Sequence, residues 1–348
     1  MRRVVLGLSL SLAMVLSGCR GTATGGQRDH PSDMLGLVPV ADIPLPGSSS
    51  RLDYQSLDQE AHRLYIAHLG ASTVIVVDTQ AEKVVGSVLN ISQVHGVLAI
   101  PALKRVYASA TGSHQVAAIE MMNLAVTDRT AGGDYPDGLA FDPDDHKVFV
   151  SDEHGGAVVV VGIQTDQQTA SIPVGGDVGN IQYDLVSKRI YTAVGATNQL
   201  VAIDPAQDRV LDRYALPGCG HAHGLLVDTA TRLAFIACDE NATLVVFNLQ
   251  THTITNTQTV GDQPDVLAFD AGLGRLYVAA ESGVVAVFQE QNGSVTKLGQ
   301  ALLAANAHTV AVDQETHRIY FPLENVGGHP VLRVMAPTNS QPAPKGTP

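Results

Sequence analysis

Basic residues are scarce in this sequence, and tryptophan is absent. The chain holds 21 Lys and Arg against 34 Asp and Glu, which gives a formal net charge of −13. Removal of the first eighteen residues, which include Arg2 and Arg3 but no acid, would make this charge more negative by two. Because phosphate binding needs clustered Lys and Arg, we expect no nucleic-acid partner. An acidic surface favours cations or basic partners instead.

Several catalytic motifs and long helical patterns are also missing. The sequence contains no G-x-S-x-G nucleophile elbow, no phosphate-binding loop and no C-x-x-C-H haem site. No stretch in the middle of the chain keeps a helical apolar period without a Gly, Pro or Asn break. With 33 glycines, 17 prolines and 45% hydrophobic residues, the composition is typical of a β-rich globular domain with many turns.

The N-terminus, MRRVVLGLSLSLAMVLSGC, has the pattern of an export signal. Its apolar run from Val4 to Leu16 follows two arginines and is too short for an ordinary membrane span. The run ends in Leu16-Ser-Gly-Cys19, which resembles the lipobox of bacterial lipoproteins. The resemblance implies a signal peptide of residues 1–18, cleavage before Cys19 and lipidation of the Cys19 sulfur. A plain secretory signal with an unrelated cysteine is the alternative.

Lipidation would anchor the exported chain to the membrane of the cell envelope through its N-terminus. In a Gram-negative host, Arg20 in place of Asp after the cysteine favours the outer membrane, facing the periplasm. We expect residues 19–35 to be the lipidated cysteine and a small, polar tether. Residues 337–348 have the composition of a disordered tail, which leaves residues 36–336 for the folded domain.

Between the tether and the tail, one strand-like phrase recurs seven times. Each copy carries an aromatic residue, and successive copies lie 42 to 44 residues apart. These residues are Tyr65, Tyr107, Phe149, Tyr191, Phe235, Tyr277 and Tyr320. Every unit contains several short strands and no helical segment, and the period matches propeller repeats. The sequence therefore predicts an all-β fold, a seven-bladed β-propeller of four-stranded antiparallel blades.

The seventh unit lacks a fourth strand. After its aromatic residue the chain has one more strand-like segment, VLRVMAP, and then the tail. Residues 36–45, GLVPVADIPL, precede the first unit and have the pattern of an outer strand. We expect this N-terminal strand to complete the last blade, because ring closure leaves only short sheet edges exposed.

The repeated phrases resemble those of the YVTN-repeat, YncE-like β-propellers. Residues 136–151 and 264–278 match the family phrase closely, and Leu200–Asp204 matches its closing apolar strand. The resemblance covers residues 36–336 and implies the fold, although the Asn that ends the family phrase is replaced in every unit. One propeller scaffold serves many tasks, so the resemblance leaves function open. The absence of Trp disfavours the quinone-dependent dehydrogenase propellers, whose repeats are Trp-rich.

Two aligned positions concern the innermost strand of each unit. Its last residue is Ile100 in one unit and Asp in the other six, which indicates a turn cap with a structural role. The six are Asp58, Asp142, Asp184, Asp228, Asp270 and Asp313. Five residues earlier lies a second position, which we call the rim position because it should surround the mouth of the central channel. Its members are Asp53, His95, Asp137, Gly179, His223, Asp265 and His308.

Six rim residues are His or Asp, which are ligands for divalent metals such as zinc, copper or calcium. The candidate ligands are His223, Asp265 and His308 from successive units, then His95, Asp53 and Asp137. Further acids and histidines follow the second strand of several units, and they are densest in units five to seven. They are Glu153, Asp239, Glu281 and Glu324, with His68, Asp152, His154 and His221 nearby. A solvated polar rim without a ligand fits the same pattern.

Two cysteines remain in the folded domain. An exported compartment permits a disulfide, and the expected strand register places Cys219 within about two positions of Cys238 across a hairpin. Two free thiols are the alternative. In that case Cys219, His221 and His223 could together bind copper or zinc.

Two functions fit these observations. The first is a membrane-anchored, non-enzymatic binding protein that presents its His, Asp and Glu residues to a cation, a small ligand or an envelope protein. The second is a metal-dependent enzyme similar to lactonase or streptogramin-lyase propellers, in which a metal on the channel axis polarises a carbonyl or activates water. In the second hypothesis, Glu281 or Glu324 is the catalytic base.

Overall fold

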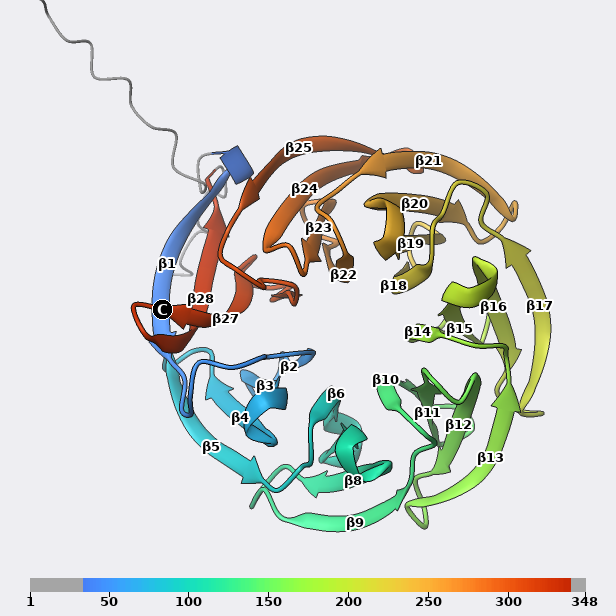
Figure 1. Ribbon diagram of the computed structural model, residues 1–348, viewed down its shortest axis with the longest axis horizontal. Helices are drawn as coiled ribbons and strands as arrows, with labels where there is room; N and C mark the ends of the chain where they lie inside the picture. Colours follow the sequence, from blue (N-terminus) through green and yellow to red (C-terminus); the bar gives the residue numbers. More distant parts are fainter. Residues whose placement is uncertain (1–33, 339–348) are drawn as a thin grey trace, which may run out of the picture.

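The computed structural model describes residues 34–338, which form seven four-stranded antiparallel sheets arranged in a ring around a central channel (Figure 1). Six blades are built from consecutive strands. Blade 1 contains β2 (Gln55–Asp58), β3 (Arg63–His68), β4 (Thr73–Asp78) and β5 (Lys83–Leu89). Blade 2 contains β6 (Val94–Ile100), β7 (Arg105–Ala110), β8 (Gln115–Glu120) and β9 (Val126–Ala131). Blade 3 contains β10 (Pro136–Asp142), β11 (Lys147–Asp152), β12 (Ala157–Gly162) and β13 (Gln167–Pro173).

The next three blades repeat this order. Blade 4 contains β14 (Val178–Asp184), β15 (Arg189–Val194), β16 (Gln199–Asp204) and β17 (Arg209–Ala215). Blade 5 contains β18 (Ala222–Asp228), β19 (Leu233–Cys238), β20 (Thr243–Asn248) and β21 (Thr253–Thr259). Blade 6 contains β22 (Pro264–Asp270), β23 (Arg275–Ala280), β24 (Val284–Gln291) and β25 (Ser294–Leu302). Five single turns of 3-10 helix lie between strands: η1 (Leu69–Ala71), η2 (Pro101–Leu103), η3 (Thr111–Ser113), η4 (Gly195–Thr197) and η5 (Asp239–Asn241).

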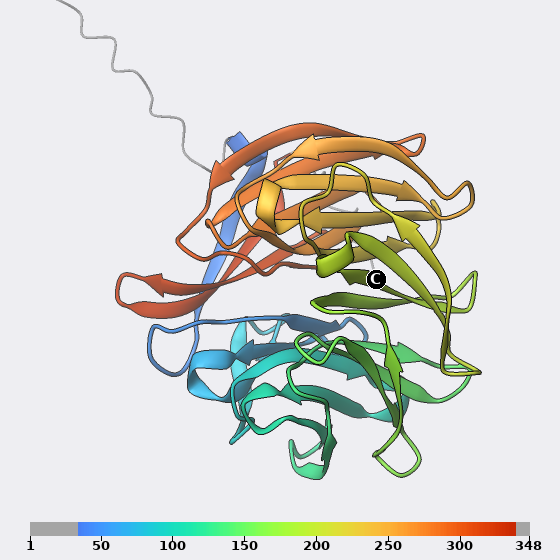
Figure 2. The same cartoon turned by 45° about the vertical axis from the view of Figure 1, so that its right-hand side comes forward.

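The seventh blade joins the two ends of the described chain. Its sheet order is β26 (Ala311–Val312), β27 (Ile319–Val326), β28 (His329–Pro337) and β1 (Leu37–Pro44). Strand β1 pairs antiparallel with β28 from Leu37 opposite Pro337 to Pro44 opposite Val331. The predicted fold and its closure by an N-terminal strand are therefore confirmed. Figure 2 shows the hairpin of β27 and β28 projecting beyond the neighbouring blades.

The hydrophobic core lies between the blades. Each aromatic residue of the repeat is at most 2% exposed. Tyr320 of blade 7, for example, packs in one cluster with Leu64 and Ile66 of blade 1, and Tyr65 packs in another with Val106 of blade 2. Burial of one such side chain contributes about 1.5–3 kcal/mol, so this position of the repeat holds each blade to the next.

The aspartates at the ends of the innermost strands cap the following turns, as the sequence predicted. Asp58 Oδ1 accepts a hydrogen bond from the Ala61 N–H at 3.0 Å, and Asp270 Oδ1 accepts one from the Leu273 N–H at the same distance. Blade 2 has Ile100 in this position, and its turn is η2 instead.

Some predictions concern residues that the structure does not describe. The signal peptide, Cys19, most of the tether and residues 339–348 lie outside residues 34–338. Strand β28 includes Pro337, one residue beyond the predicted end of the domain. Within the described part of the chain, no helix has the length and apolar character needed to cross a membrane.

Candidate functional site

The mouth of the channel is built on a β-bulge that recurs in blades 2 to 6. In blade 3 the register between the first two strands shifts between Pro136 and Leu139, and in blade 5 it shifts between Ala222 and Leu225. Two residues of each innermost strand thus lie outside the regular ladder, and bulges of this kind redirect side chains. The first residue of each pair occupies the rim position: His95, Asp137, Gly179, His223 and Asp265.

Glycine at the second bulge residue lets neighbouring blades approach closely. A Cβ atom on Gly224 would lie 2.0 Å from the carbonyl oxygen of Asp265. A Cβ atom on Gly96 would lie equally close to the carbonyl oxygen of Asp137. Since no side chain can occupy that space, glycine is required there. The close approach of blades 5 and 6 places His223 Nε2 3.5 Å from Asp265 Oδ1.

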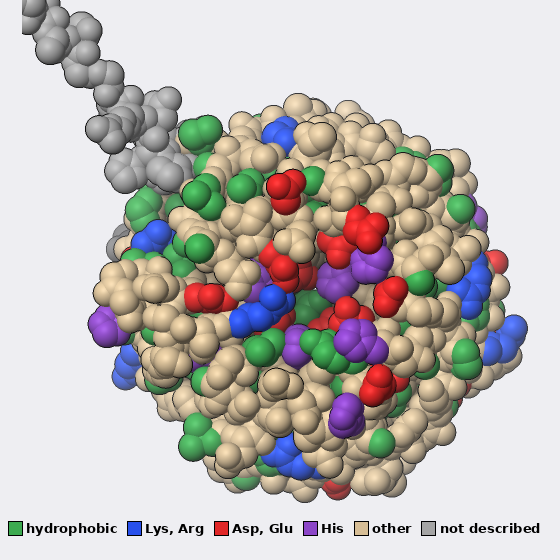
Figure 3. All heavy atoms as spheres, viewed as in Figure 1, with side chains coloured by type: hydrophobic (Ala, Val, Ile, Leu, Met, Phe, Trp, Pro, Cys, Tyr) green, Lys and Arg blue, Asp and Glu red, His purple; other side chains and the backbone are tan. Residues whose placement is uncertain are grey.

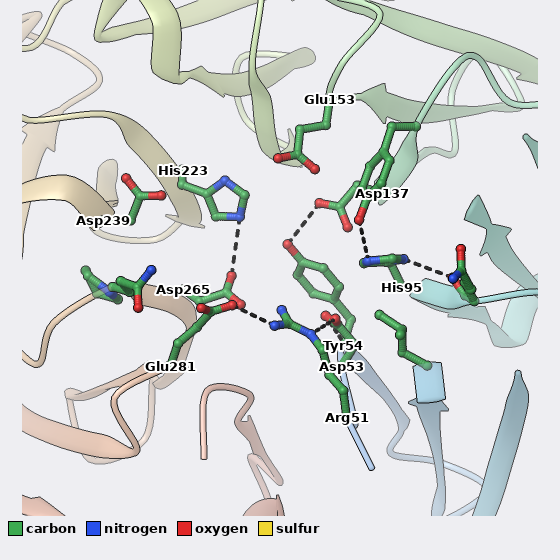
Figure 4. A pocket seen from close by; sticks show the side chains of 15 residues that line it. Arg51, Asp53, Tyr54, His95, Asp137, Glu153, His223, Asp239, Asp265 and Glu281 are labelled. Atoms are coloured by element: carbon green, nitrogen blue, oxygen red, sulfur yellow. Dashed lines mark hydrogen bonds and ion pairs between the residues drawn. The ribbon is translucent and has the colours of Figure 1, made fainter. Parts of the chain in front are cut away.

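A cavity of about 420 Å³ opens at this mouth. In Figure 3, acidic and histidine side chains gather around the central hollow. Figure 4 shows such side chains converging from innermost strands, as for Asp137 and His223, and from segments that follow second strands, as for Glu281. Six carboxylates line the cavity, and Arg51 is the one Lys or Arg among the described residues that do so. The six are Asp53, Asp137, Glu153, Asp239, Asp265 and Glu281.

The electrostatics of the cavity are set by buried charges that face one another. Burial alone lowers the pKa of His223, but its close contact and charge interaction with Asp265 outweigh burial and raise the pKa to about 10. Burial raises the pKa of Asp265, and the contacts with His223 reverse this and hold it below its usual value. His223 and Asp265 therefore form an ion pair at neutral pH.

Asp137 has the opposite environment. Burial, followed by the negative charges of Asp53 and Glu153, raises the pKa of Asp137 well above its usual value. Its side chain accepts a hydrogen bond from the Tyr54 hydroxyl at 3.2 Å, across the channel from blade 1 to blade 3. Asp137 therefore has no ion-paired cation among the described residues, and it holds its proton more readily than an exposed aspartate does.

Three residues of the site are missing from the sequence-based prediction. Arg51 donates from Nε to Asp53 Oδ2 at 3.0 Å and from Nη1 to Glu281 Oε1 at 2.8 Å, which ties blade 1 to blade 6. Tyr54 fills part of the channel, and the Tyr135 hydroxyl lies 2.9 Å from His95 Nε2. Arg51 and Tyr135 stand two residues before the rim position and Tyr54 stands directly after it, so a comparison of these neighbouring positions would have drawn attention to all three.

The candidate metal ligands fall into two groups. Asp53, Asp265 and His308 come from blades 1, 6 and 7 and offer ligand atoms that all lie within 4.8 Å of one another. His223 lies beside this group through its contact with Asp265. His95 lies across the mouth, with its two ring nitrogens 2.9 Å from the Gln93 carbonyl oxygen and the Tyr135 hydroxyl. Asp137 lies against Tyr54.

Three of the six carboxylates that line the mouth come from blades 5 and 6, as expected, but the other three come from blades 1 and 3 and none comes from blade 7. Glu281 lines the cavity and pairs with Arg51. Glu324 is not among the cavity-lining residues and accepts a hydrogen bond from Asn306 Nδ2. The reason is that β27 continues to Val326, past the point where the second strand of other blades ends, so Glu324 belongs to the projecting hairpin.

Of the remaining residues, His221 and Asp239 pair with each other, with Nδ1 and Oδ1 2.8 Å apart. His68 is fully buried, and its Nε2 lies 3.0 Å from the Ser50 hydroxyl. Asp152 accepts hydrogen bonds from the backbone N–H groups of Asp134 and Tyr135. The His154 ring packs against Tyr135, with ring centroids 4.2 Å apart.

Cys219 and Cys238 are joined by a disulfide, with Cα atoms 5.3 Å apart. Ala222 lies directly opposite Cys238 in the ladder of β18 and β19, so the bridge fastens the loop before β18 to the end of β19. With both sulfurs engaged in this bond, neither is a thiolate ligand for a metal together with His221 and His223.

The ring of seven four-stranded blades defines the chain as a seven-bladed β-propeller. Among solved structures, it is similar to a chain of hydrazine synthase from Kuenenia stuttgartiensis, with a TM-score of 0.70 and 15% sequence identity. The match covers 83% of this chain and 96% of that chain. At this identity the likeness shows the fold alone. No family model matches the sequence, and no curated protein matches it.

Proposed function

We propose that this protein is an exported, membrane-anchored binding protein whose channel mouth holds a small, positively charged ligand. The observation that carries the proposal is the excess of carboxylates over Lys and Arg around one cavity at the channel mouth. Six carboxylates and one arginine line the cavity. Its volume of about 420 Å³ lies within the range of small-molecule sites.

The burial of these carboxylates supports the same proposal. Asp53, Asp137 and Asp265 are 1%, 3% and 6% exposed. Buried carboxylates are stable when a cation or hydrogen-bond donor compensates each of them. Arg51 forms ion pairs with Asp53 and Glu281, and His223 forms one with Asp265. Asp137 has the Tyr54 hydroxyl but no ion-paired cation among the described residues, and its pKa is raised, so a bound cation would favour its ionised form.

The contacts of the two candidate bases also favour binding over catalysis. Glu281 is held by Arg51, with Oε1 2.8 Å from Nη1, so this carboxylate is already engaged in an ion pair. Glu324 is hydrogen-bonded to Asn306 and does not line the cavity. A general base needs hydrogen-bond reach to the proton that it removes.

Calorimetric titration at low ionic strength tests the ligand class, with Zn²⁺, Ca²⁺ and putrescine as three separate probes. We expect at least one probe to bind, and the double variant Glu153→Gln with Asp239→Asn to weaken binding about tenfold, because two nearby negative charges are removed. Glu60→Gln with Glu315→Gln is the matched control, since both side chains are exposed in turns outside the cavity. The proposal is wrong if none of the probes binds at millimolar concentration.

Cell fractionation tests the anchor. The wild-type chain should sediment with membranes, and Cys19→Ser should move it to the soluble exported fraction, because the acyl acceptor is lost. Equal distribution of the two forms would contradict lipidation at Cys19 and leave the ligand site untouched.

A further inference from the structure

His308 is a buried imidazole with one ring nitrogen that lacks a partner. The side chain is 0% exposed. Its Nδ1 lies 2.9 Å from the carbonyl oxygen of Asn306, which can only accept, so Nδ1 carries the hydrogen. In the neutral ring, Nε2 then presents a lone pair. This Nε2 has no hydrogen-bond partner among residues 34–338 and lies 4.0 Å from Asp265 Oδ2.

This arrangement is typical of a histidine that ligates a metal. Metal-bound imidazoles usually donate their second N–H to a backbone carbonyl or a carboxylate, which fixes the tautomer and the ring orientation. A buried polar atom without a partner is otherwise unfavourable, because it has lost its hydrogen bonds to water and gained none in the protein. Asp265 Oδ1 is a second buried atom without a hydrogen-bond partner in the described part of the chain, although it lies 3.5 Å from His223 Nε2 in an ion pair. His308 and Asp265 belong to the same small group.

The third member of the group is Asp53 of blade 1, which lies beside blade 7 in the closed ring. Its Oδ1 accepts the Tyr54 N–H at 3.0 Å and its Oδ2 accepts Arg51 Nε at 3.0 Å, so its orientation is fixed. Each carboxylate oxygen has a second lone pair, and these remain for a ligand. The ligand atoms of Asp53, Asp265 and His308 all lie within 4.8 Å of one another. Tetrahedral zinc ligands stand roughly 3.4 Å apart, given bonds of about 2.1 Å, so a small contraction completes the site.

We infer that Asp53, Asp265 and His308 bind a single divalent transition-metal ion at the base of the channel mouth. An imidazole with two carboxylates suits zinc-like ions better than calcium or magnesium, which prefer oxygen ligands alone. His223 lies next to this group as the ion-pair partner of Asp265, so it is not counted among the ligands. The inference rests on the proposed function, because it names the ligand of the same mouth.

His95 provides an internal control for His308. Its Nδ1 also lies 2.9 Å from the carbonyl oxygen two residues earlier, in Gln93. Both Gln93 and Asn306 adopt a positive φ, so the same local backbone orients both rings. The difference is the other nitrogen, because His95 Nε2 has the Tyr135 hydroxyl at 2.9 Å. His95 is therefore satisfied by the protein itself, and only His308 is predicted to need a metal.

Zinc titration of the purified, chelator-treated protein tests the inference. We expect one Zn²⁺ per chain, an affinity loss of about 100-fold or more in His308→Gln, and a change of less than about threefold in His95→Gln. His308→Cys gives a direct readout that does not depend on affinity. With Co²⁺ it should show the thiolate-to-cobalt charge-transfer absorption, which the wild type lacks.

The outcomes separate this inference from the proposed function. Absence of zinc binding together with binding of putrescine would overturn the metal site and leave the cation-binding mouth in place. Absence of binding by Zn²⁺, Ca²⁺ and putrescine would overturn both. Equal zinc affinity in His308→Gln, or no charge-transfer absorption in His308→Cys with Co²⁺ bound, would place the ion elsewhere and refute the assignment.

Discussion

The innermost strands carry acidic side chains at both of their ends, which we call the turn end and the rim end. The surroundings of these side chains differ between the two ends. At one end, six aspartates are buried and accept hydrogen bonds from the N–H groups of their own turns. At the other end, the rim position varies from blade to blade, and five of its seven residues line the cavity. The first end is repeated because every blade needs the same turn, whereas the second end differs because it serves one site.

Asp184 and Asp137 show the difference most clearly. For Asp184, burial raises the pKa, but hydrogen bonds from Arg232 and Ser187 outweigh burial and lower it. For Asp137, burial and nearby negative charges both raise the pKa. Asp142 lies at the turn end but has one carboxylate oxygen without a hydrogen-bond partner among the described residues, and burial raises its pKa. The partners of an aspartate, rather than its burial, decide whether it stabilises the fold.

The largest expected effect is at the turn end. Asp184→Ala leaves Arg232 without its buried partner and removes the turn cap, so we expect a loss of about 3 kcal/mol in the free energy of unfolding. The comparison variant Asp228→Ala should lose about 1 kcal/mol, since Asp228 bonds its turn without an arginine. Urea unfolding at pH 7 measures both, and equal losses would show that the Arg232 contact contributes nothing.

The pH dependence of Asp184→Ala has a defined sign. The pKa of Asp184 is lower in the folded than in the unfolded state, so the ionised form stabilises the fold above the unfolded pKa. This contribution is lost as the pH falls through the folded pKa. The gap between wild type and variant should therefore narrow in acid. A gap that stays constant down to pH 2 would contradict the lowered pKa.

A smaller effect of opposite sign is expected at the mouth. The pKa of Asp137 is higher in the folded state, so stability is present below the unfolded pKa and declines as the pH rises toward the folded value. Asp137→Asn keeps an acceptor for the Tyr54 hydroxyl and removes the charge. We expect it to raise the free energy of unfolding at pH 7 by about 1 kcal/mol.

The same variant should bind cations more weakly, which links the instability of the mouth to its function. Thermal unfolding at pH 7 and pH 3.5 measures the first effect, and the gain should vanish at the lower pH. Calorimetric titration measures the second. If Asp137→Asn were less stable than the wild type and bound cations equally well, Asp137 would stabilise the fold as the turn aspartates do. The contrast between the two ends of the innermost strands would then be wrong.

The sequence was sufficient for the repeat but only partly for the site. Blades could be predicted because the aromatic residues, the apolar strands and the turn aspartates recur locally in every unit. The rim position could be predicted for the same reason. Its partners could not, because Arg51 and Tyr54 occur in one blade and act across the ring on Glu281 and Asp137.

The sequence also could not show which of the candidate metal ligands lie close together in space. His223, Asp265 and His308 follow one another along the chain, and the sequence therefore favoured them as a set. Ring closure brings Asp53 of blade 1 beside blade 7, and the close set becomes Asp53, Asp265 and His308. Which side chains converge depends on bulge geometry and rotamers, which a single sequence does not encode in a readable pattern.

The smallest expected effect is that of Glu324→Gln, a substitution just outside the channel mouth. Glu324 has the same place in the repeat as Glu281, but β27 carries it into the projecting hairpin, where Asn306 is its hydrogen-bond donor. Glu324→Gln keeps an acceptor for that donor, so stability should change by less than about 0.5 kcal/mol and affinity for the cation probes by less than about twofold. Because the hydrogen bond survives the substitution, a tenfold loss of affinity in Glu324→Gln would have to come from its charge. Such a loss would extend the mouth to blade 7 and remove the distinction between a residue that resembles the site in sequence and one that belongs to it.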